Sequence, residues 1–298
     1  MSAEGHVPAP AGDFVLPFDL PAAGVRGRLV RLDASSARAL SAHALPEAPS
    51  RVLGETLALS VILGTALKLD GRLTVQTKSG GPLDLVAADY YGADDGKPKG
   101  VRGFARFQEG ATETTFDKLV GTGSLAITIE PRTGGQTYQG IVALAPDGIA
   151  ASAEAYFMRS EQLPTALRLA AGPLYEAGKT GAQWRAAGIM LQVTPDAKRS
   201  EDDWERLVMH LKTTEDLELL DTTLPAETLL WRLFNEDEVR VLPAEPVAFR
   251  CECDRERIAT VLRSYTPEER AGLADPDGVI RARCEFCGTV HEIEAGAL

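Results

Sequence analysis

The sequence predicts an α+β fold: a large domain followed by a small appendage. The chain has 298 residues and is 44% hydrophobic, enough for one large core and a small satellite domain. Short strand-like segments separated by Gly- and Pro-containing turns alternate with apolar helical stretches, which favours antiparallel sheets with packed helices. All four cysteines lie within the last 48 residues. The appendage is therefore expected to be chemically different from the rest.

The N-terminal segment, residues 1–24, is rich in Pro and Ala and is predicted to be a mobile tail. It has neither the basic start nor the apolar run of a secretory signal. Val25 to Leu32 alternates as a strand, and Asp33 is then placed to cap a helix. Ser50 to Leu69 has a strongly apolar helical pattern, which predicts a buried core helix.

A run of strands is predicted next, with helical character returning at 149–160 and a last strand at 189–193. The turn signals between the strands favour antiparallel pairing. These elements define a predicted N-terminal α+β domain, residues 25–195. The strands of the run are expected at 72–77, 83–88, 101–107, 124–130 and 137–144.

Residues 196–248 are predicted to form an acidic helical linker. Between Asp196 and Glu245 there are 6 basic and 14 acidic residues. Apolar residues recur at helical spacing, with a second helix beginning near Pro225. The helices are interpreted either as an ordinary amphipathic pair packed on the large domain or as a conditional lid. The predicted lid residues are Trp204, Leu207, Leu211, Leu230, Trp231 and Phe234.

Charge and hydropathy exclude several classes of partner. The net charge of −12 argues against a nucleic-acid backbone as the main partner. No segment has the roughly 18 uncharged apolar residues that a membrane span requires. A cytoplasmic location is expected, and in that reducing compartment paired cysteines are more often metal ligands or redox switches than structural disulfides.

The cysteines follow the pattern C-x-C, 30 intervening residues, then C-x-x-C, at Cys251, Cys253, Cys284 and Cys287. Thiolates two residues apart in an extended segment project to the same side and can bind one ion. The second pair, followed by Gly288, has the form of a zinc knuckle. One Zn²⁺ held by four sulfurs is therefore predicted. His291 is a weaker candidate ligand.

The predicted domain 249–298 has few large apolar side chains, so zinc is expected to supply most of its folding energy. A domain of this size gains about 3–5 kcal/mol from its core, whereas structural zinc contributes about 10–16 kcal/mol. Oxidation and zinc retention exclude each other because both use the same thiolates. A disulfide between Cys251 and Cys253 is expected to be strained, and hence labile and regulatory.

The cysteine signature, with Phe249-Arg250 before it and Glu285-Phe286 inside it, resembles the heat shock protein 33 family of redox-regulated holdase chaperones. Further segments resemble that family in the same order, so the resemblance extends from Gly27 to Ile293. They are Leu73-Thr74-Val75-Gln76, Gly80-Gly81-Pro82, Tyr156 to Gln162, Gly188 to Gln192 and Leu229 to Phe234. Asp254 and His291 depart from the family pattern without removing a ligand.

The resemblance implies an ATP-independent chaperone, not an enzyme, that is inactive while reduced and zinc-bound. Oxidation is implied to pair Cys251 with Cys253 and Cys284 with Cys287, to release zinc and to unfold the linker. The opened protein is then implied to dimerise and to hold unfolding client proteins until reduction and foldase chaperones return.

Two other functions remain open from the sequence. A zinc-ribbon nucleic-acid-binding module requires a basic face, but residues 249–298 carry 7 Arg and 10 Asp or Glu. A C-x-x-C thiol–disulfide oxidoreductase would place Cys284 at the start of a helix in a βαβ unit, whereas the sequence here predicts two strands around the pair.

Overall fold

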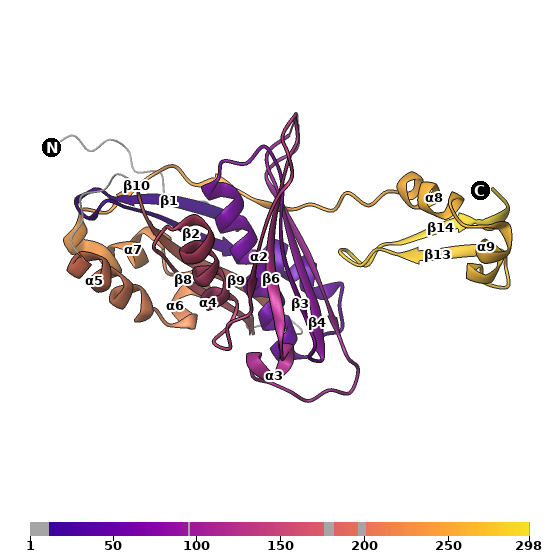
Figure 1. Ribbon diagram of the computed structural model, residues 1–298, viewed down its shortest axis with the longest axis horizontal. Helices are drawn as coiled ribbons and strands as arrows, with labels where there is room; N and C mark the ends of the chain where they lie inside the picture. Colours follow the sequence, from indigo (N-terminus) through magenta and orange to yellow (C-terminus); the bar gives the residue numbers. More distant parts are fainter. Residues whose placement is uncertain (1–11, 95, 176–181, 196–200, 298) are drawn as a thin grey trace. The chain divides into compact units, whose positions relative to one another are not determined.

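The computed structural model describes residues 12–94, 96–175, 182–195 and 201–297 (Figure 1). The chain divides into two compact units, one ending at Phe249 and the other beginning at Arg250. The units are described separately below. None of the described helices is long and apolar enough to cross a membrane.

The first sheet of the N-terminal unit has the strand order β10-β1-β2-β9-β8, and β11 also pairs with β1. All of its pairings are antiparallel. The short strands β10 and β11 come from the end of the predicted linker and lie along the outer edge of β1. The strands are β1 (Phe14–Leu20), β2 (Val25–Leu32), β8 (Thr165–Leu174), β9 (Gln183–Val193), β10 (Arg240–Val241) and β11 (Glu245–Pro246).

The second sheet has the order β12-β5-β4-β3-β6-β7. Its pairings are antiparallel except that β12 runs parallel to β5. The strands are β3 (Gly71–Ser79), β4 (Leu83–Tyr91), β5 (Gly100–Phe107), β6 (Gly123–Pro131), β7 (Tyr138–Ala143) and β12 (Ala248–Phe249).

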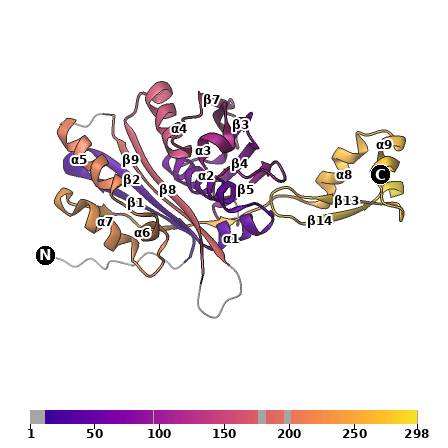
Figure 2. The same cartoon turned by 90° about the horizontal axis from the view of Figure 1, so that it is seen from below.

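Helix α2 (Glu47–Ala66) lies between the two sheets and contacts strands of both (Figure 2). Its sequence is apolar around almost the whole circumference, as expected of a helix buried on all sides. The main hydrophobic core forms around it from both sheets. Smaller helices complete this layer: α1 (Ala34–Ser41), α3 (Phe116–Val120) and α4 (Ile149–Tyr156), the last followed by a π-turn over Phe157–Glu161.

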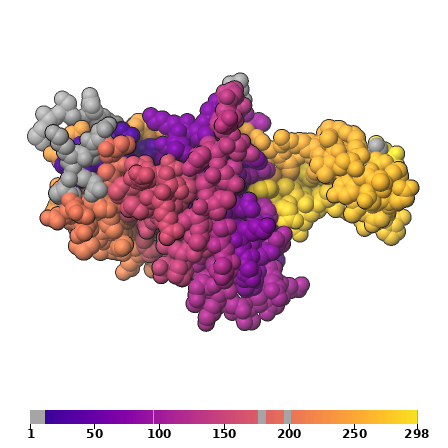
Figure 3. All heavy atoms as spheres, in the orientation of Figure 1, coloured from indigo at the N-terminus to yellow at the C-terminus, as the bar shows by residue number. Residues whose placement is uncertain are grey.

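The other face of the first sheet is covered by the acidic helices α5 (Glu201–Lys212), α6 (Asp216–Leu220) and α7 (Ala226–Phe234) (Figures 1 and 2). Their apolar side chains form a second core with β1, β2, β8 and β9. In the space-filling view the orange atoms of these helices lie directly against the rest of the N-terminal unit (Figure 3).

The C-terminal unit pairs two small helices with a hairpin. These are α8 (Arg255–Arg263), α9 (Pro267–Leu273), β13 (Val279–Arg283) and β14 (Val290–Glu294). Asp254 caps α8 by accepting a hydrogen bond from the N–H of Arg257. Among the described residues of this unit, the buried apolar core comprises Ala259, Leu262, Ile280 and Ile293.

The α+β fold class is confirmed, but the predicted tail is wrong over its second half. Residues 14–20 form β1, which pairs with β2 along its whole length, and its side chains Phe14, Leu16, Phe18 and Leu20 are buried in the core shared with α5 to α7. Residues 1–11 lie outside the described part of the chain, as do residues 196–200.

The predicted capping role of Asp33 is also wrong. Its side chain makes no capping bond and instead accepts from Arg185. The carboxylate of Asp13 caps α1, accepting from the N–H groups of Asp33 and Ser35. A residue before β1 thus fixes a helix two elements later, a contact that local sequence rules do not detect.

Candidate metal centre

The first cysteine pair lies on an extended segment immediately before α8. Cys251 and Cys253 flank Glu252, whose carboxylate forms an ion pair with Arg250 at 2.6 Å. Asp254 then begins the helix, so the cap fixes where the extended segment ends.

The second pair lies on the turn that joins β13 to β14. The N–H of Gly288 donates to the carbonyl of Cys284 at 2.9 Å, and the N–H of Cys284 donates to the carbonyl of Thr289. Gly288 has φ +70, a left-handed conformation that favours glycine. These bonds close the turn and direct both cysteines of the pair to the same place.

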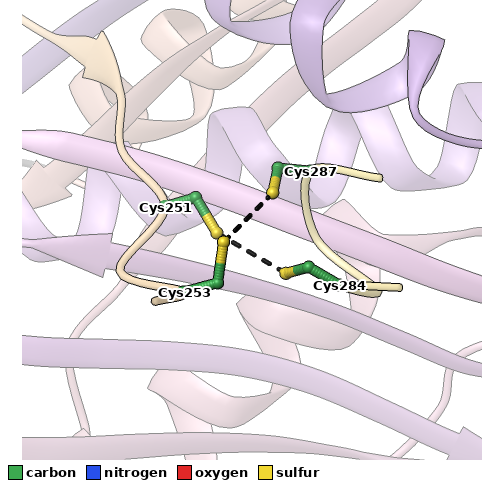
Figure 4. Close-up of side chains that lie close together, drawn as sticks. All are labelled: Cys251, Cys253, Cys284 and Cys287. Atoms are coloured by element: carbon green, nitrogen blue, oxygen red, sulfur yellow. Dashed lines mark hydrogen bonds between the residues drawn. The ribbon is translucent and has the colours of Figure 1, made fainter. Parts of the chain in front are cut away.

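The four sulfur atoms all lie within 4.8 Å of one another (Figure 4). Cys251 Sγ lies 3.7 Å from Cys284 Sγ, and Cys253 Sγ lies 3.4 Å from Cys287 Sγ. In a tetrahedral site with Zn–S bonds near 2.3 Å, sulfurs are separated by about 3.8 Å. The cluster therefore fits a single zinc ion with only small adjustments.

The protonation of the cluster is uneven. Burial and the neighbouring sulfurs raise the pKa of the Cys253 thiol, and burial raises that of Cys284. Burial also acts to raise the pKa of Cys287, but the hydrogen bonds with Thr289, Cys253 and Cys251 together outweigh it and lower the value to about 6. Four adjacent thiolates repel one another without a cation, so a divalent ion is the natural counter-charge for this donor set.

His291 is not part of the cluster formed by the described residues. It lies on β14 opposite Ala282, and its side chain is partly buried. Thr289 is the contact that the sequence analysis missed. Its position two residues after a knuckle cysteine is the signal that could have indicated it.

The structure places the predicted lid residues on the helices that cover the first sheet. Leu207 and Leu211 on α5, and Leu230 and Phe234 on α7, are fully buried there. Trp204 is partly buried against the same core. Trp231 does not belong to this apolar surface: it lies on the outer side of α7 and is 63% exposed. At i+1 from Leu230 it faces away from the sheet.

Two arginines of the first sheet, which the sequence analysis missed, hold α6 and the segments on either side of it. Arg31 on β2 donates to three lid carbonyls, those of Glu218, Leu219 and Leu224, at 3.2, 3.1 and 2.5 Å. These partners lie about 190 residues away in the sequence, so no local pattern reveals them.

Arg168 on β8 holds the start of α6 in the same way. It donates to the Thr214 carbonyl at 3.0 Å and to Asp216 at 2.6 Å. Arg51 on α2 lies 3.5 Å from the same carboxylate. The position of α6 is therefore set by side chains from three other elements.

A sheet-and-helix unit covered by acidic helices, followed by a small tetracysteine unit, defines an α+β protein with a candidate structural metal site. The sequence model of the Hsp33 protein family matches residues 13–294. The chain belongs to the Hsp33 family.

Named relatives and a solved structure agree with that assignment. The chain is 38% identical over 293 residues to the 33 kDa chaperonin of Caulobacter vibrioides, covering 95% of each chain. It is 37% identical over 272 residues to the 33 kDa chaperonin of Vibrio cholerae, covering 91% of this chain and 89% of the relative. The crystal structure of the 33 kDa chaperonin from Thermotoga maritima has a similar fold, with a TM-score of 0.76, 21% identity and 95% of each chain covered. The family and the relatives' names support a chaperone function.

Proposed function

We propose that this protein is a redox-regulated, ATP-independent holdase that is inactive when reduced and zinc-bound. The observation that carries the proposal is the meeting of four sulfurs within 4.8 Å in a unit whose buried core is very small. A redox switch needs a part of the protein that oxidation can unfold. The C-terminal unit buries few apolar side chains, so little else would stabilise it once its cysteines are oxidised.

Cys251, Cys253, Cys284 and Cys287 would hold the zinc, which supplies positive charge that keeps the four thiolates together. Oxidation removes the donors. Each disulfide forms as two thiols lose two protons and two electrons, which one hydrogen peroxide molecule takes up to become two water molecules. The proposed pairs are Cys251 with Cys253 and Cys284 with Cys287, because near partners meet far more often once the cage opens.

The lid helices α5 to α7 are the proposed regulated element. They cover an apolar sheet face that includes Phe18, Leu29 and Ile189, all nearly inaccessible in this state. The rest of the lid is strongly acidic, so the helices repel themselves when they leave the sheet and remain hydrated. An uncovered apolar face of this kind is the proposed surface for unfolding clients.

The lid is connected to the switch through the chain between α7 and Cys251. That segment pairs with β1 through β10 and β11, and with β5 through β12. Cys251 follows β12 by two residues. We infer that loss of order around Cys251 frays β12 first and then loosens the lid. Dimerisation after opening and client transfer to foldase chaperones belong to the same proposal.

Zinc and thiol quantification coupled to an aggregation assay tests the switch. Reduced protein is expected to hold one zinc and to leave client aggregation unchanged. Peroxide at elevated temperature should release zinc, remove four thiols and suppress aggregation, with dithiothreitol and zinc reversing all three. Suppression that starts while all four thiols remain reduced contradicts the proposal, and mapping that finds mainly Cys253–Cys284 links contradicts the pairing.

A matched pair of tryptophan variants tests the lid. Trp204→Asp should weaken packing of α5 on the sheet and give partial activity without oxidation. Trp231→Asp introduces the same charge at an exposed site and should stay inactive when reduced. If Trp204→Asp opens the lid by hydrogen exchange yet remains inactive, the lid does not restrain the client surface.

The structure does not favour either of the two alternative functions. The C-x-x-C pair lies on the turn between β13 and β14, whereas thiol–disulfide oxidoreductases place it at a helix start. Acidic residues outnumber basic ones in the C-terminal unit, which disfavours nucleic acid.

A further inference from the structure

An apolar cavity of about 350 Å³ lies in the N-terminal unit, away from the lid helices. It forms where the C-terminal end of α2 meets the second sheet, the end of α4 and strand β9. The volume lies within the range of small-molecule sites. Its lining residues are Leu63, Ala66, Leu67, Leu73, Ile127, Ile129, Tyr138, Tyr156, Phe157, Glu161, Leu163 and Gln192.

The lining combines apolar walls with one cluster of oxygens. Glu161 Oε1 accepts hydrogen bonds from the hydroxyls of Tyr156 at 2.9 Å and Tyr138 at 3.2 Å. The two hydroxyl oxygens are 3.4 Å apart. Burial, followed by the hydrogen bonds to Tyr138 and Glu161, raises the pKa of Tyr156, so its phenol stays protonated and can donate. Three oxygens thus meet at the solvent-facing end of a mainly apolar cavity, where Glu161 is exposed and Tyr138 is half-exposed, and Gln192 is the other polar residue of the lining.

Two backbone features build this cluster. Gly140 on β7 lets the Tyr156 ring approach, because a Cβ at that position would lie 2.2 Å from the ring. The π-turn over Phe157–Glu161 ends at Gln162, whose φ of +54 reverses the chain after Glu161. Single turns of π-helix, such as this one at the end of α4, occur frequently at functional sites.

The charge of the lining selects the ligand. Glu161 is its sole ionisable carboxylate, and no Lys, Arg or His lines the cavity as described. An ammonium group has three donors, which match the lone pairs of three converging oxygens. The faces of nearby aromatic rings also attract cations; Tyr156 and Phe157 lie edge to face with centroids 5.4 Å apart.

We propose that this cavity binds a primary alkylammonium ion, with its apolar chain among the leucine and isoleucine side chains and its ammonium group against Glu161, Tyr138 and Tyr156. Leu67 and Tyr138 are 54% and 45% exposed, and give the chain a route from solvent. The site does not involve the cysteines or the lid, and its occupancy does not depend on the holdase function.

Calorimetric titration of the full-length reduced, zinc-loaded protein tests the ligand class. Octylammonium chloride, octanol and sodium octanoate have the same chain with a cationic, neutral or anionic head. One octylammonium ion should bind per chain, at least about tenfold more tightly than octanol, because a charge-assisted hydrogen bond is lost in the alcohol. Octanoate should bind more weakly than octanol. Equal affinity for octanol and octylammonium would overturn the proposal.

Glu161→Gln keeps the size of the side chain and removes its charge. It should weaken octylammonium binding about tenfold and leave octanol binding within about twofold. Glu109→Gln, the same change at an exposed turn outside the cavity, should leave both affinities unchanged. A preference for octylammonium that survives in Glu161→Gln contradicts the assigned site. Gly140→Ala, which displaces the Tyr156 ring, should weaken both probes, and unchanged binding in that variant also contradicts the site.

Discussion

The N-terminal and C-terminal units differ in what holds each together. In the N-terminal unit, α2 and two sheets bury a large continuous core, and the lid helices add a second core on the outer face. In the C-terminal unit, the described residues include four buried apolar side chains and a separate cluster of four cysteine sulfurs. Apolar burial changes little under mild oxidation, whereas sulfur chemistry changes completely. We therefore expect the same oxidant to unfold the C-terminal unit and to leave the N-terminal sheets folded.

Removal of zinc should give the largest difference between the units. Structural zinc contributes about 10–16 kcal/mol of apparent binding energy, more than this small core can replace. A chelator should abolish the dispersed amide signals of residues 250–297 in NMR spectra while those of β3 to β6 remain. Loss of both sets together would refute the independence of the two units, and retention of both would refute zinc-dependent folding.

Truncation of a buried lid residue should separate the lid from the main core. Phe234 is fully buried and stacks on Phe18, with ring centroids 6.0 Å apart. Phe234→Ala should cost about 3–5 kcal/mol and open the lid before the sheets. Trp231→Ala on the exposed side of the same helix is the control. Hydrogen exchange of α5 to α7 measures the effect, and equal exchange in the two variants would contradict the assigned packing.

Loss of the Arg31 side chain should have a somewhat smaller effect on the same helices. Arg31→Ala leaves lid carbonyls without their donor, at a cost of about 3 kcal/mol. The exposed neighbour Arg26 provides the matched control, Arg26→Ala. Arg31→Ala should increase protease cleavage within residues 201–248 and basal holdase activity, and Arg26→Ala should change neither. Lid protection that persists in Arg31→Ala would show that the apolar contacts alone hold the helices.

The pH dependence of the N-terminal unit should reflect Glu55. Glu55 lies on α2, and its burial, partly offset by Arg51, raises its pKa from 4.5 to about 7. The folded state therefore binds more protons than the unfolded state, and stability should fall as the pH rises from about 4.5 through 7, by at most about 1.4 kcal/mol per pH unit. Glu55→Gln should flatten this slope in urea titrations at pH 5 and 8. An unchanged slope would assign it to other groups.

Removal of the α8 cap should have the smallest effect. Asp254→Ala deletes the acceptor for the Arg257 N–H, worth about 1 kcal/mol. Because α8 directly follows Cys253, the variant should release zinc at lower chelator concentration, with the thermal transition of the N-terminal unit unchanged. Glu268→Ala, which removes a carboxylate at an exposed position on α9, is the control.

Local patterns predicted the parts of the molecule that are determined locally. The alternation of Val25 to Leu32 gave β2 with its correct ends, and the spacing of the cysteines predicted that all four meet.

Elements that depend on distant partners could not be predicted. β1 follows a Pro- and Ala-rich stretch and contains Pro17, so its pattern resembles a tail until β2, β10 and β11 pair with it. β8 was missed because its side chains are buried on both faces over most of its length, so its sequence shows no alternation. Asp13 and Arg31 act on residues far along the chain. The exposure of Trp231 could not be predicted because it depends on which side of α7 packs on the sheet.

The short strands β10 and β11 also protect the border of the first sheet. They occupy the outer side of β1, where backbone N–H and C=O groups would otherwise remain open to another strand. In the proposed opening, the segment 240–246 would leave with the lid, and β1 would become an edge able to pair with an extended chain or with the same strand of a second copy. Opening would then offer directional main-chain hydrogen bonds in addition to an apolar face, and we expect self-association to compete with client capture for this one strand.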